Sequence, residues 1–266
     1  MLGYSRLLMS ESITFPIVPV PPETSSDAQG HRSAQRLDIA KIKAITIDLD
    51  DTLWPIWPTI ERAEAVLAAW LAERAPATSA AFPDAKSLRR IRDQVEAERP
   101  DLLHDLSGMR RESIRMALAQ SGDDPALADA AFDLFFEERQ RVVLFDDALA
   151  TLEFLSQRYP VVALSNGNAD IHRVGIGPYF KSAFSAREFG VAKPDVRIFH
   201  AAAQSVGVAP YEVLHVGDDA ALDVVGALNA GMQTAWVNMK GQPWVLESSP
   251  PHVSVSTLAE LCALLR

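Results

Sequence analysis

Residues 45–55 read ITIDLDDTLWP, a short apolar run that ends in three closely spaced carboxylates. The β-branched residues of this run are typical of a buried strand. Asp48, Asp50 and Asp51 follow it within four residues. Like charges about 4 Å apart repel each other by roughly 4 kcal/mol at an effective dielectric of 20. Other parts of the chain must therefore supply a feature that offsets this repulsion.

The pattern of the first strand recurs three times further along the chain. Residues 161–165 (VVALS), 213–217 (VLHVG) and 234–237 (TAWV) are short apolar runs, and residues 146–158, 195–206 and 220–230 have helical patterns. Such alternation predicts parallel βαβ units with helices on both faces of one sheet. The expected fold class is α/β, a doubly wound parallel sheet of the Rossmann-like type.

A long helical block interrupts this alternation directly after the first strand. Amphipathic helical patterns cover residues 59–74, 85–99, 107–121 and 125–141, with no convincing strand among them. A block of this length predicts an inserted all-α domain, and the Pro- and Ser-rich start of the chain predicts a loosely ordered tail. The expected division is a flexible N-terminal extension at 1–40, an α/β core at 41–56 and 145–266, and a helical domain at 57–144.

The composition argues against several classes of partner. The 266 residues carry a formal net charge of −10, whereas non-specific nucleic-acid binding needs a basic surface. No apolar stretch reaches the roughly 18 residues of a membrane span. The single cysteine, Cys262, cannot form an internal disulfide, which suits a reducing compartment. We expect a cytoplasmic protein without nucleic-acid or membrane partners, and either a monomer or a homodimer.

Polar residues follow several of the predicted strands, at the edge where open parallel sheets bind ligands. Residues two apart in a strand face the same way, so Asp48 and Asp50 are expected to point together. Asp218 and Asp219 follow the strand at 213–217. With Asp48 they predict a cluster of hard oxygen ligands that suits Mg²⁺, and Asp223 is the alternative to Asp219 as the further acid.

Cationic and hydrogen-bonding groups are predicted at the same edge. Lys193 precedes a predicted helix, and Ser165 ends the strand at 161–165. The lysine and a bound metal would neutralise a phosphate that lies next to an aspartate. Ser165 and the backbone amides of Asn166 and Gly167 would hold the oxygens of that phosphate.

These residues resemble the four motifs of the haloacid dehalogenase superfamily, in the order DLDDT, Ser165, Lys193 and GDD followed by Asp223. The resemblance implies that Asp48 attacks phosphorus and forms an aspartyl-phosphate, and that Asp50 is the general acid and base. It implies phosphate contacts from Ser165 and Lys193, and a role for Thr52 in orienting Asp50. It implies metal ligation by Asp48, Asp218 and the main-chain carbonyl of Asp50. Because the dehalogenases of this superfamily lack an acid at the position of Asp50, the resemblance favours a phosphatase.

The helical block resembles the cap that selects substrates in this superfamily. Residues 95–105 (VEAERPDLLHD) and 110–118 (RRESIRMAL), with motifs in the core, resemble bacterial flavin-pathway phosphatases, which act on FMN and 5-amino-6-(5-phospho-D-ribitylamino)uracil. His104 and Arg111 are candidate contacts to such a substrate, and Trp54 is a candidate to stack on its ring. The alternatives are a core histidine, an ion pair within the cap, and packing between core and cap.

Other functions are compatible with part of this pattern. A phosphatase of a nucleoside monophosphate, phosphoglycolate or a sugar phosphate would use the same chemistry on a different small metabolite. A phosphomutase shares the cap and the aspartate pair but releases no net phosphate. A non-catalytic phosphate-binding or receiver-like module also clusters acids with Ser and Lys, although it has no need of Asp50 or of the helical block.

Overall fold

The computed structural model describes residues 36–266, and most of the predicted extension at 1–40 lies outside this range. The strands are β1 (Ala44–Ile47), β2 (Val161–Ser165), β3 (Ser182–Ser185), β4 (Val213–Gly217), β5 (Gln233–Val237) and β6 (Val253–Val255). The helices are α1 (Ile56–Arg74), α2 (Pro76–Ala81), α3 (Ala85–Glu98), α4 (Leu106–Ser121), α5 (Ala128–Arg139), α6 (Ala148–Ser156), α7 (Ile171–Val174), α8 (Ala186–Phe189), α9 (Val196–Ser205), α10 (Gly226–Asn229) and α11 (Leu258–Leu264). A π-helix, η7 (Ala220–Val225), precedes α10.

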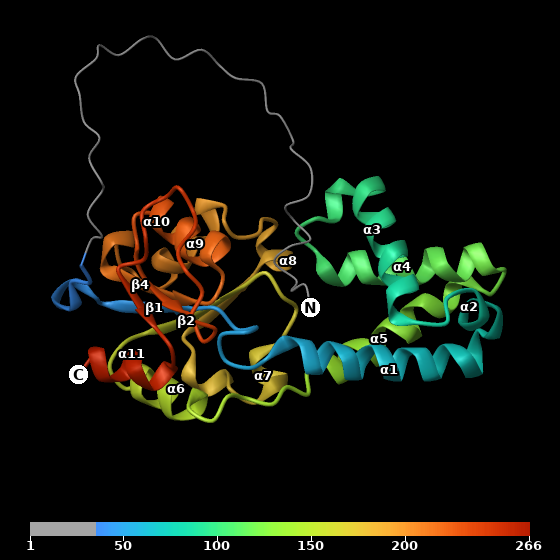
Figure 1. Ribbon diagram of the computed structural model, residues 1–266, viewed down its shortest axis with the longest axis horizontal. Coiled ribbons are helices and arrows are strands. Elements are labelled where there is room, and N and C mark those ends of the chain that lie inside the picture. Colours follow the sequence, from blue (N-terminus) through green and yellow to red (C-terminus); the bar gives the residue numbers. More distant parts are fainter. Residues whose placement is uncertain (1–35) are drawn as a thin grey trace, which may run out of the picture.

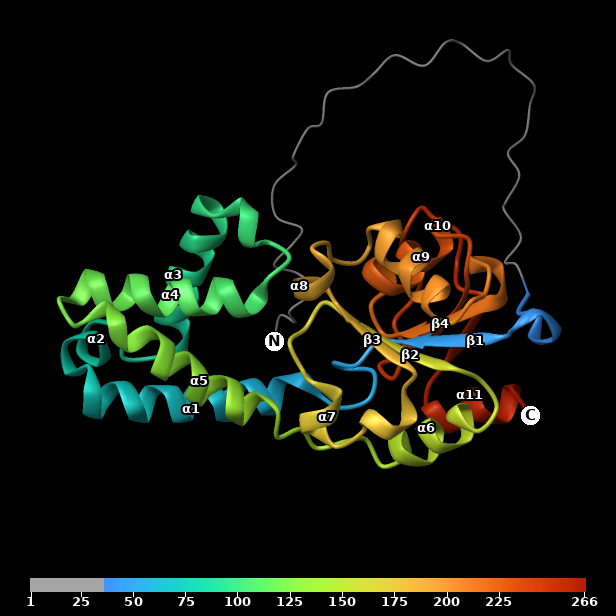
Figure 2. The ribbon, with the colours of Figure 1, turned by 180° about the vertical axis from the view of Figure 1, so that it is seen from behind.

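The six strands form one parallel sheet in the order β3-β2-β1-β4-β5-β6 (Figures 1 and 2). The strand order reverses direction at β1, which lies between β2 and β4. The crevice at such a switch point is where open α/β sheets bind ligands. The predicted doubly wound parallel sheet is therefore confirmed, and residues that follow β1, β2 and β4 meet at one edge.

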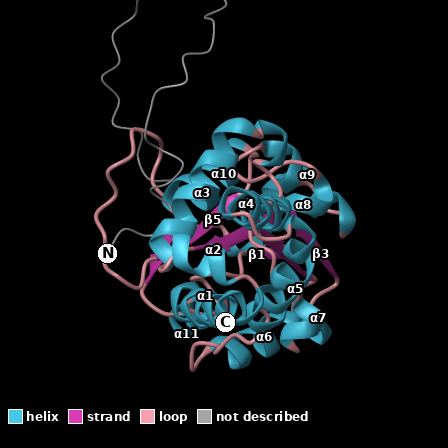
Figure 3. Cartoon of the chain, turned by 90° about the vertical axis from the view of Figure 1, so that its right-hand side faces the viewer, coloured by secondary structure: helices cyan, strands magenta, loops and turns pink. Residues whose placement is uncertain are grey.

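Helices cover both faces of the sheet, as Figure 3 shows along a perpendicular view. Alternate strand residues serve the two faces. On one face Ile45, Ile47 and Ala163 pack with α6 and α11, in a cluster that also includes Leu152 and Leu261. On the other face Ala44, Val162 and Leu164 pack with α9 and α10. All four residues of β1 are buried, which fits its sequence AITI, in which the one polar residue, Thr46, pairs with the buried His215.

Helices α1 to α5 form a helical insertion between β1 and the rest of the core (Figure 1). Leu67 and Leu71 of α1, Leu118 of α4, and Phe132 and Phe135 of α5 belong to a buried cluster separate from those of the sheet. A bundle with its own apolar cluster is what the amphipathic patterns predicted. Within residues 36–266, no helix combines the length and the apolar character that crossing a bilayer requires.

Candidate active site

A tight turn after β1 arranges the carboxylates of the DLDDT segment. Asp51 has a φ of 57°, a left-handed conformation that Asp adopts more readily than most residues. Its amide donates to the carbonyl of Trp54 at 2.7 Å, and its carboxylate accepts from the amide of Ile56 at 3.0 Å. The turn thereby brings Trp54 back beside Asp50 and starts α1.

Lys193 lies between two buried carboxylates at the centre of the site. Its Nζ donates to Oδ1 of Asp48 and to Oδ1 of Asp223, both at 2.6 Å. All three side chains are almost fully buried. A buried charge is tolerated only when it is paired, so this lysine supplies part of the compensation that the carboxylates require. The hydrogen bond to Lys193 uses Oδ1 of Asp48, and Oδ2 of Asp48 faces no described donor within residues 36–266.

The electrostatics show that one lysine does not balance this cluster. Burial, together with the charge of Asp223, raises the pKa of Asp48 to about 8, against the attraction of Lys193. Burial and the carboxylates of Asp223 and Asp48 also raise the pKa of Asp218. Burial alone would lower the pKa of Lys193, but Asp223 and Asp48 together raise it, so the lysine stays charged.

Asp48, Asp218 and Asp223 form the group that could hold a metal ion. Each offers one carboxylate oxygen, and these oxygens lie within 4.8 Å of one another. Asp219, the acid first expected with them, instead accepts hydrogen bonds from the amides of Ala221 and Leu222 at 2.8 Å and caps η7. The open alternative, Asp223, is therefore the acid that the structure groups with Asp48 and Asp218.

Asp223 reaches the cluster because η7 and β4 hold it closely. A Cβ atom at Gly217 would lie 2.3 Å from the carboxylate carbon of Asp223, so only glycine fits at the end of β4. The buried His215 contacts Asp223 through Nε2 at 3.1 Å and Thr46 through Nδ1 at 2.8 Å. Burial lowers the pKa of His215, so the ring is neutral near pH 7 and donates to the carboxylate. Sequence reasoning missed both His215 and the role of Gly217.

Thr52 contacts a different carboxylate from the one expected. Its hydroxyl donates to Oδ1 of Asp218 at 3.2 Å, and Thr52 is fully buried. The predicted contact from Thr52 to Asp50 is not present in this structure. The turn after β1 directs the threonine toward the end of β4, and Thr52 therefore fixes a proposed metal ligand.

The loop after β2 brings Ser165, Asn166 and Gly167 to the same edge. Asn166 receives a hydrogen bond from the amide of Lys193 at 2.7 Å and donates to its carbonyl at 2.9 Å. The Asn166 side chain thus holds the loop that carries Lys193. The amide of Gly167 donates to the hydroxyl of Ser165 at 2.9 Å. Both residues lie where a phosphate contact was predicted, and that contact stays a prediction.

Asp50 is held by two side chains that the sequence did not single out for this purpose. Nη2 of Arg139 lies 2.7 Å from both carboxylate oxygens of Asp50. The indole N–H of Trp54 donates to Oδ1 at 2.8 Å. Trp54 is fully buried, so its ring has no face open to a substrate, and the predicted stacking does not fit this structure.

The predicted substrate contacts in the helical insertion have other surroundings. Nε of Arg111 lies 3.1 Å from Oδ1 of Asp129, and its guanidinium lies over the ring of Phe132. This matches the alternative of an ion pair within the helical insertion. His104 is half-buried between η3 (Pro100–Leu102) and α4, and no hydrogen bond described for residues 36–266 joins it to the acidic cluster.

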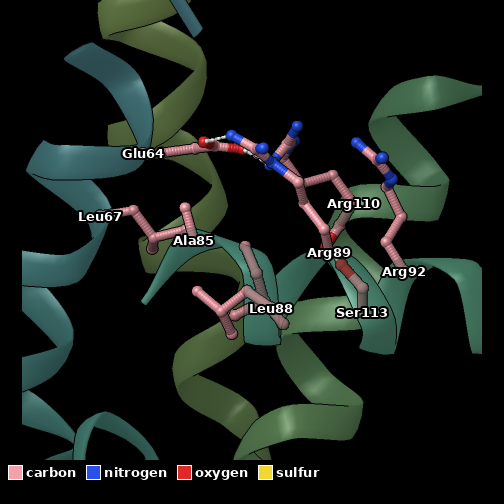
Figure 4. A pocket seen from close by; sticks show the side chains of 9 residues that line it. Glu64, Leu67, Ala85, Leu88, Arg89, Arg92, Arg110 and Ser113 are labelled. Carbon is pink, nitrogen blue, oxygen red and sulfur yellow. Dashed lines mark hydrogen bonds and ion pairs between the residues drawn. The ribbon is translucent and has the colours of Figure 1, made fainter. Parts of the chain in front are cut away.

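A pocket in the helical insertion has a mixed charged and apolar lining (Figure 4). Glu64 of α1 points toward Arg89 of α3, with which it pairs at 2.5 Å. Nη1 of Arg110 lies 3.8 Å from Glu64, and its guanidinium covers the ring of Phe135. These residues, rather than Arg111, form the charged interior of the bundle.

Comparison with known proteins places this geometry in a family. The profile of haloacid dehalogenase-like hydrolases matches residues 42–231. The chain is 34% identical over 235 residues to the 5-amino-6-(5-phospho-D-ribitylamino)uracil phosphatase YigB of Escherichia coli K12, covering 85% of this chain and 98% of YigB. It is 36% identical over 147 residues to a phosphoserine phosphatase of Thermus thermophilus, covering 53% of this chain and 59% of that protein.

A solved structure has the same architecture. The 2-haloacid dehalogenase structure from Pseudomonas syringae pv. tomato DC3000 superposes with a TM-score of 0.79 at 36% sequence identity, covering 84% of this chain and 98% of that chain. The family profile spans more than half of the chain, including β1, β2, β4 and the acidic cluster. The chain belongs to the haloacid dehalogenase-like hydrolase family.

Proposed function

We propose that the protein is a Mg²⁺-dependent phosphomonoester hydrolase that works through an aspartyl-phosphate on Asp48. The observation that carries this proposal is the pair of carboxylates after β1, one bound to Lys193 and the other held separately by Arg139 and Trp54. Two carboxylates in different surroundings can take different roles, one as nucleophile and one as acid and base. The proposed cap is the helical insertion at 57–144, on the core at 41–56 and 145–266.

Asp50 also separates this proposal from dehalogenation, the activity in the name of the superposed structure. An alkyl halide leaves as a halide and needs no proton, whereas the oxygen of a phosphate ester does. Dehalogenases of the superfamily lack an acid at this position. The three clustered carboxylates likewise suit a cation beside a phosphate, and halide displacement has no evident use for them.

In the first displacement, Asp48 attacks the phosphorus of the substrate through its free oxygen. A bond forms between Oδ2 of Asp48 and phosphorus, the ester bond breaks, and Asp50 gives its proton to the departing oxygen. Lys193 lies 2.6 Å from Asp48 and is placed to neutralise charge on the phosphoryl group. Phosphoryl transfer depends mainly on such positioning and neutralisation.

In the second displacement, Asp50 takes a proton from a water molecule that attacks the aspartyl-phosphate. The water oxygen bonds to phosphorus, the bond to Asp48 breaks, and inorganic phosphate leaves. Covalent catalysis of this kind divides one difficult hydrolysis into two easier steps. Asp48 returns to its carboxylate form and Asp50 to its protonated form.

The charges of the site fit a divalent cation. Once ionised, three carboxylates beside one ammonium group leave two uncompensated negative charges, and the oxygens are close enough to share one ion. Asp48 and Asp218 would hold Mg²⁺ together with the main-chain carbonyl of Asp50, and Asp223 would lie beside them. When bound, Mg²⁺ supplies positive charge next to the transferring phosphoryl group.

Mg²⁺ is expected to raise the melting temperature of the protein. A ligand at about 100 times its Kd adds about 2.7 kcal/mol to the free energy of unfolding, which corresponds to about 5–10 °C for a chain of this size. The raised pKa of Asp48, about 8, means that the folded chain binds more protons than the unfolded chain. Stability without metal should therefore fall as pH rises from about 4 to about 8.

Thermal unfolding with Mg²⁺ and with EDTA, at pH 5.5 and pH 8.5, tests this expectation. The shift should be larger at pH 8.5, because at pH 5.5 the metal has to displace protons from Asp48 and Asp218. Asp218→Asn, which removes one proposed ligand, is the matched control and should show a reduced shift. An equal shift in the wild type and in Asp218→Asn would contradict the assignment of the metal site.

The proposed substrates are FMN or 5-amino-6-(5-phospho-D-ribitylamino)uracil, in flavin metabolism. The support is the likeness to YigB over nearly its full length and the resemblance of the cap segments. We expect these compounds to lead a panel of phosphate esters by an order of magnitude in kcat/KM, about 1.4 kcal/mol of transition-state discrimination. The panel includes a nucleoside monophosphate, phosphoglycolate, phosphoserine and a sugar phosphate, with 2-chloropropionate as the halide substrate.

The products distinguish the competing functions. Phosphate released evenly from many esters, or fastest from another ester, would keep the phosphatase and exclude the flavin assignment. Chloride release without phosphate release would make the protein a dehalogenase. Transfer of the phosphoryl group within a sugar phosphate, with no net phosphate, would indicate a mutase. The location in the cytoplasm and the choice between monomer and homodimer stay predictions.

A further inference from the structure

Arg139 is the last residue of α5, and its guanidinium is buried against the carboxylate of Asp50. Only 1% of its surface is exposed, and Nη2 lies 2.7 Å from both Oδ1 and Oδ2. We infer that Arg139 is a positioning residue for the second displacement, in which it holds Asp50 as an oriented carboxylate ready to accept the proton of the attacking water. This inference rests on the proposed phosphatase function and assigns a residue that the family motifs do not include.

The burial of Arg139 is difficult to explain by packing alone. Desolvating a charged group costs several kcal/mol, and an apolar residue of similar volume is often as stabilising as a buried ion pair. The other terminal nitrogen, Nη1, is also buried and has no hydrogen-bond partner within residues 36–266. An unsatisfied buried donor costs about 1–3 kcal/mol. Asp50 is the partner in every polar contact described for Arg139. The buried guanidinium is therefore placed to hold that carboxylate.

Three groups confine the Asp50 carboxylate from different parts of the chain. Arg139 approaches from α5, and the indole N–H of Trp54 donates to Oδ1 at 2.8 Å. Gly167 lies against Oδ2, since a Cβ atom there would be only 2.3 Å away. The hydroxyl of Ser165 is also close to that position, at 3.1 Å. Oδ1 accepts two N–H groups and Oδ2 accepts one, from Arg139, so Oδ2 keeps more capacity to take a proton.

The end of α5 is fixed to the core loop that follows β2, which sets the position of Arg139. The side chain of Gln140 accepts from the amide of Asp170 at 2.8 Å and donates to the carbonyl of Asn168 at 3.3 Å. Nδ2 of Asn168 donates in turn to Ser107 of α4 at 3.1 Å. These contacts hold the guanidinium within hydrogen-bond distance of Asp50. A displacement of about 1 Å in such a group can cost about 100-fold in rate.

The ion pair indicates which of the two steps Arg139 assists. Both oxygens of Asp50 accept N–H groups, Oδ1 from Trp54 and Arg139 and Oδ2 from Arg139, so these contacts orient Asp50 as a hydrogen-bond acceptor, as a general base requires. The leaving group of para-nitrophenyl phosphate needs no proton, so the first transfer from this ester makes little demand on Asp50. Loss of Arg139 should therefore slow attack of water on the aspartyl-phosphate, in which oxygen bonds to phosphorus and Asp48 departs. The first transfer should be much less affected.

Arg139→Met tests this inference by kinetics and by mass, with para-nitrophenyl phosphate as the substrate. We expect kcat to fall about 100-fold, and KM to fall with it, so that kcat/KM changes by less than about tenfold. The phosphorylated enzyme should accumulate during turnover and appear in the intact mass. Arg139→Lys keeps a positive charge, as a compact ammonium group in place of the guanidinium, so its kcat should lie between those of the wild type and of Arg139→Met. A general packing defect would not enrich phosphorylated enzyme.

Arg62→Met is the matched control. Arg62 also pairs with the end of α5, through Glu138 at 2.8 Å and the carbonyl of Arg141, and it does not contact Asp50. Its kcat and KM should both stay within about threefold of the wild type, the size expected for a partly exposed ion pair. Circular dichroism and melting curves verify that each variant is folded.

The failure of this inference can be told apart from the failure of the proposed function. A wild type that releases no phosphate from any ester overturns the proposed function, and the inference with it. An active wild type with Arg139→Met at wild-type kcat overturns the inference alone. So does a loss confined to KM, or a large loss of kcat without accumulated phosphorylated enzyme.

Discussion

Asp48→Asn is expected to release no measurable phosphate from any ester. An amide lacks the anionic oxygen that attacks phosphorus, and loss of a nucleophile costs at least about 10⁴-fold in kcat. The fold should survive, because Lys193 keeps its 2.6 Å contact with Asp223. The substitution also removes one of three crowded carboxylates. Burial raises the pKa of Asp48 to about 8, so its negative charge is unfavourable in the folded protein. The melting temperature should therefore stay the same or rise.

Asp51→Asn is the matched control for this variant. Asp51 belongs to the same acidic segment, but its carboxylate accepts the amide of Ile56 and takes no part in the proposed chemistry. Asparagine also tolerates the left-handed conformation at this position. Its activity should stay within a few-fold of the wild type. Turnover by Asp48→Asn within tenfold of the wild type would remove Asp48 as the nucleophile.

Asp50→Asn is expected to lose about 10²- to 10⁴-fold in kcat, the range for removal of a general acid and base. Arg139 would also lose its counter-ion in a buried position, so the melting temperature should fall. In kcat/KM, the loss should be larger for an alkyl phosphate than for para-nitrophenyl phosphate, whose leaving group needs no proton. Equal losses for both esters would contradict the role of Asp50 as the acid.

The parts of the fold that could be predicted are those with a strong local signal. β2 and β4 have the bounds expected from their apolar runs, and β1 (Ala44–Ile47) begins one residue before the run at 45–55. β3 was missed because its sequence, SAFS, is half polar and only partly buried, and β6 because it has three residues. Both are edge strands of the sheet, where burial leaves a weaker pattern in the sequence.

The positions of the main site residues followed from the rule that strand ends meet at one edge. Asp48 and Asp218 lie together there and Ser165 ends β2, as that rule predicted, whereas Lys193 comes from the loop before α9 and contacts Asp48. The choice between Asp219 and Asp223 could not be made, because it depends on how η7 turns after β4. A local sequence pattern does not indicate that η7 is a π-helix. It therefore does not indicate that Asp223 joins the acidic cluster while Asp219 caps the start of η7.

The least predictable contact was the one from Arg139 to Asp50. The two residues are 89 positions apart, and Arg139 belongs to a run of charged residues, EERQR, that is typical of an exposed helix end. Only the tertiary arrangement of α5 on the core shows that this arginine is buried. The sequence makes Trp54 a candidate for stacking on a substrate or for packing between core and cap, because it closely follows Asp48, whereas in the structure its indole N–H donates to the carboxylate of Asp50.

The most direct test of the account is the mass of Asp50→Asn after exposure to para-nitrophenyl phosphate and Mg²⁺. Transfer to Asp48 should continue from this activated ester while hydrolysis of the aspartyl-phosphate is slow. We predict that the protein gains the mass of one phosphoryl group, and that peptide mapping places this group on Asp48. The Asp48→Asn/Asp50→Asn double variant should gain nothing. A phosphoryl group on another residue, or none on a variant that still turns over the ester, would contradict covalent catalysis by Asp48.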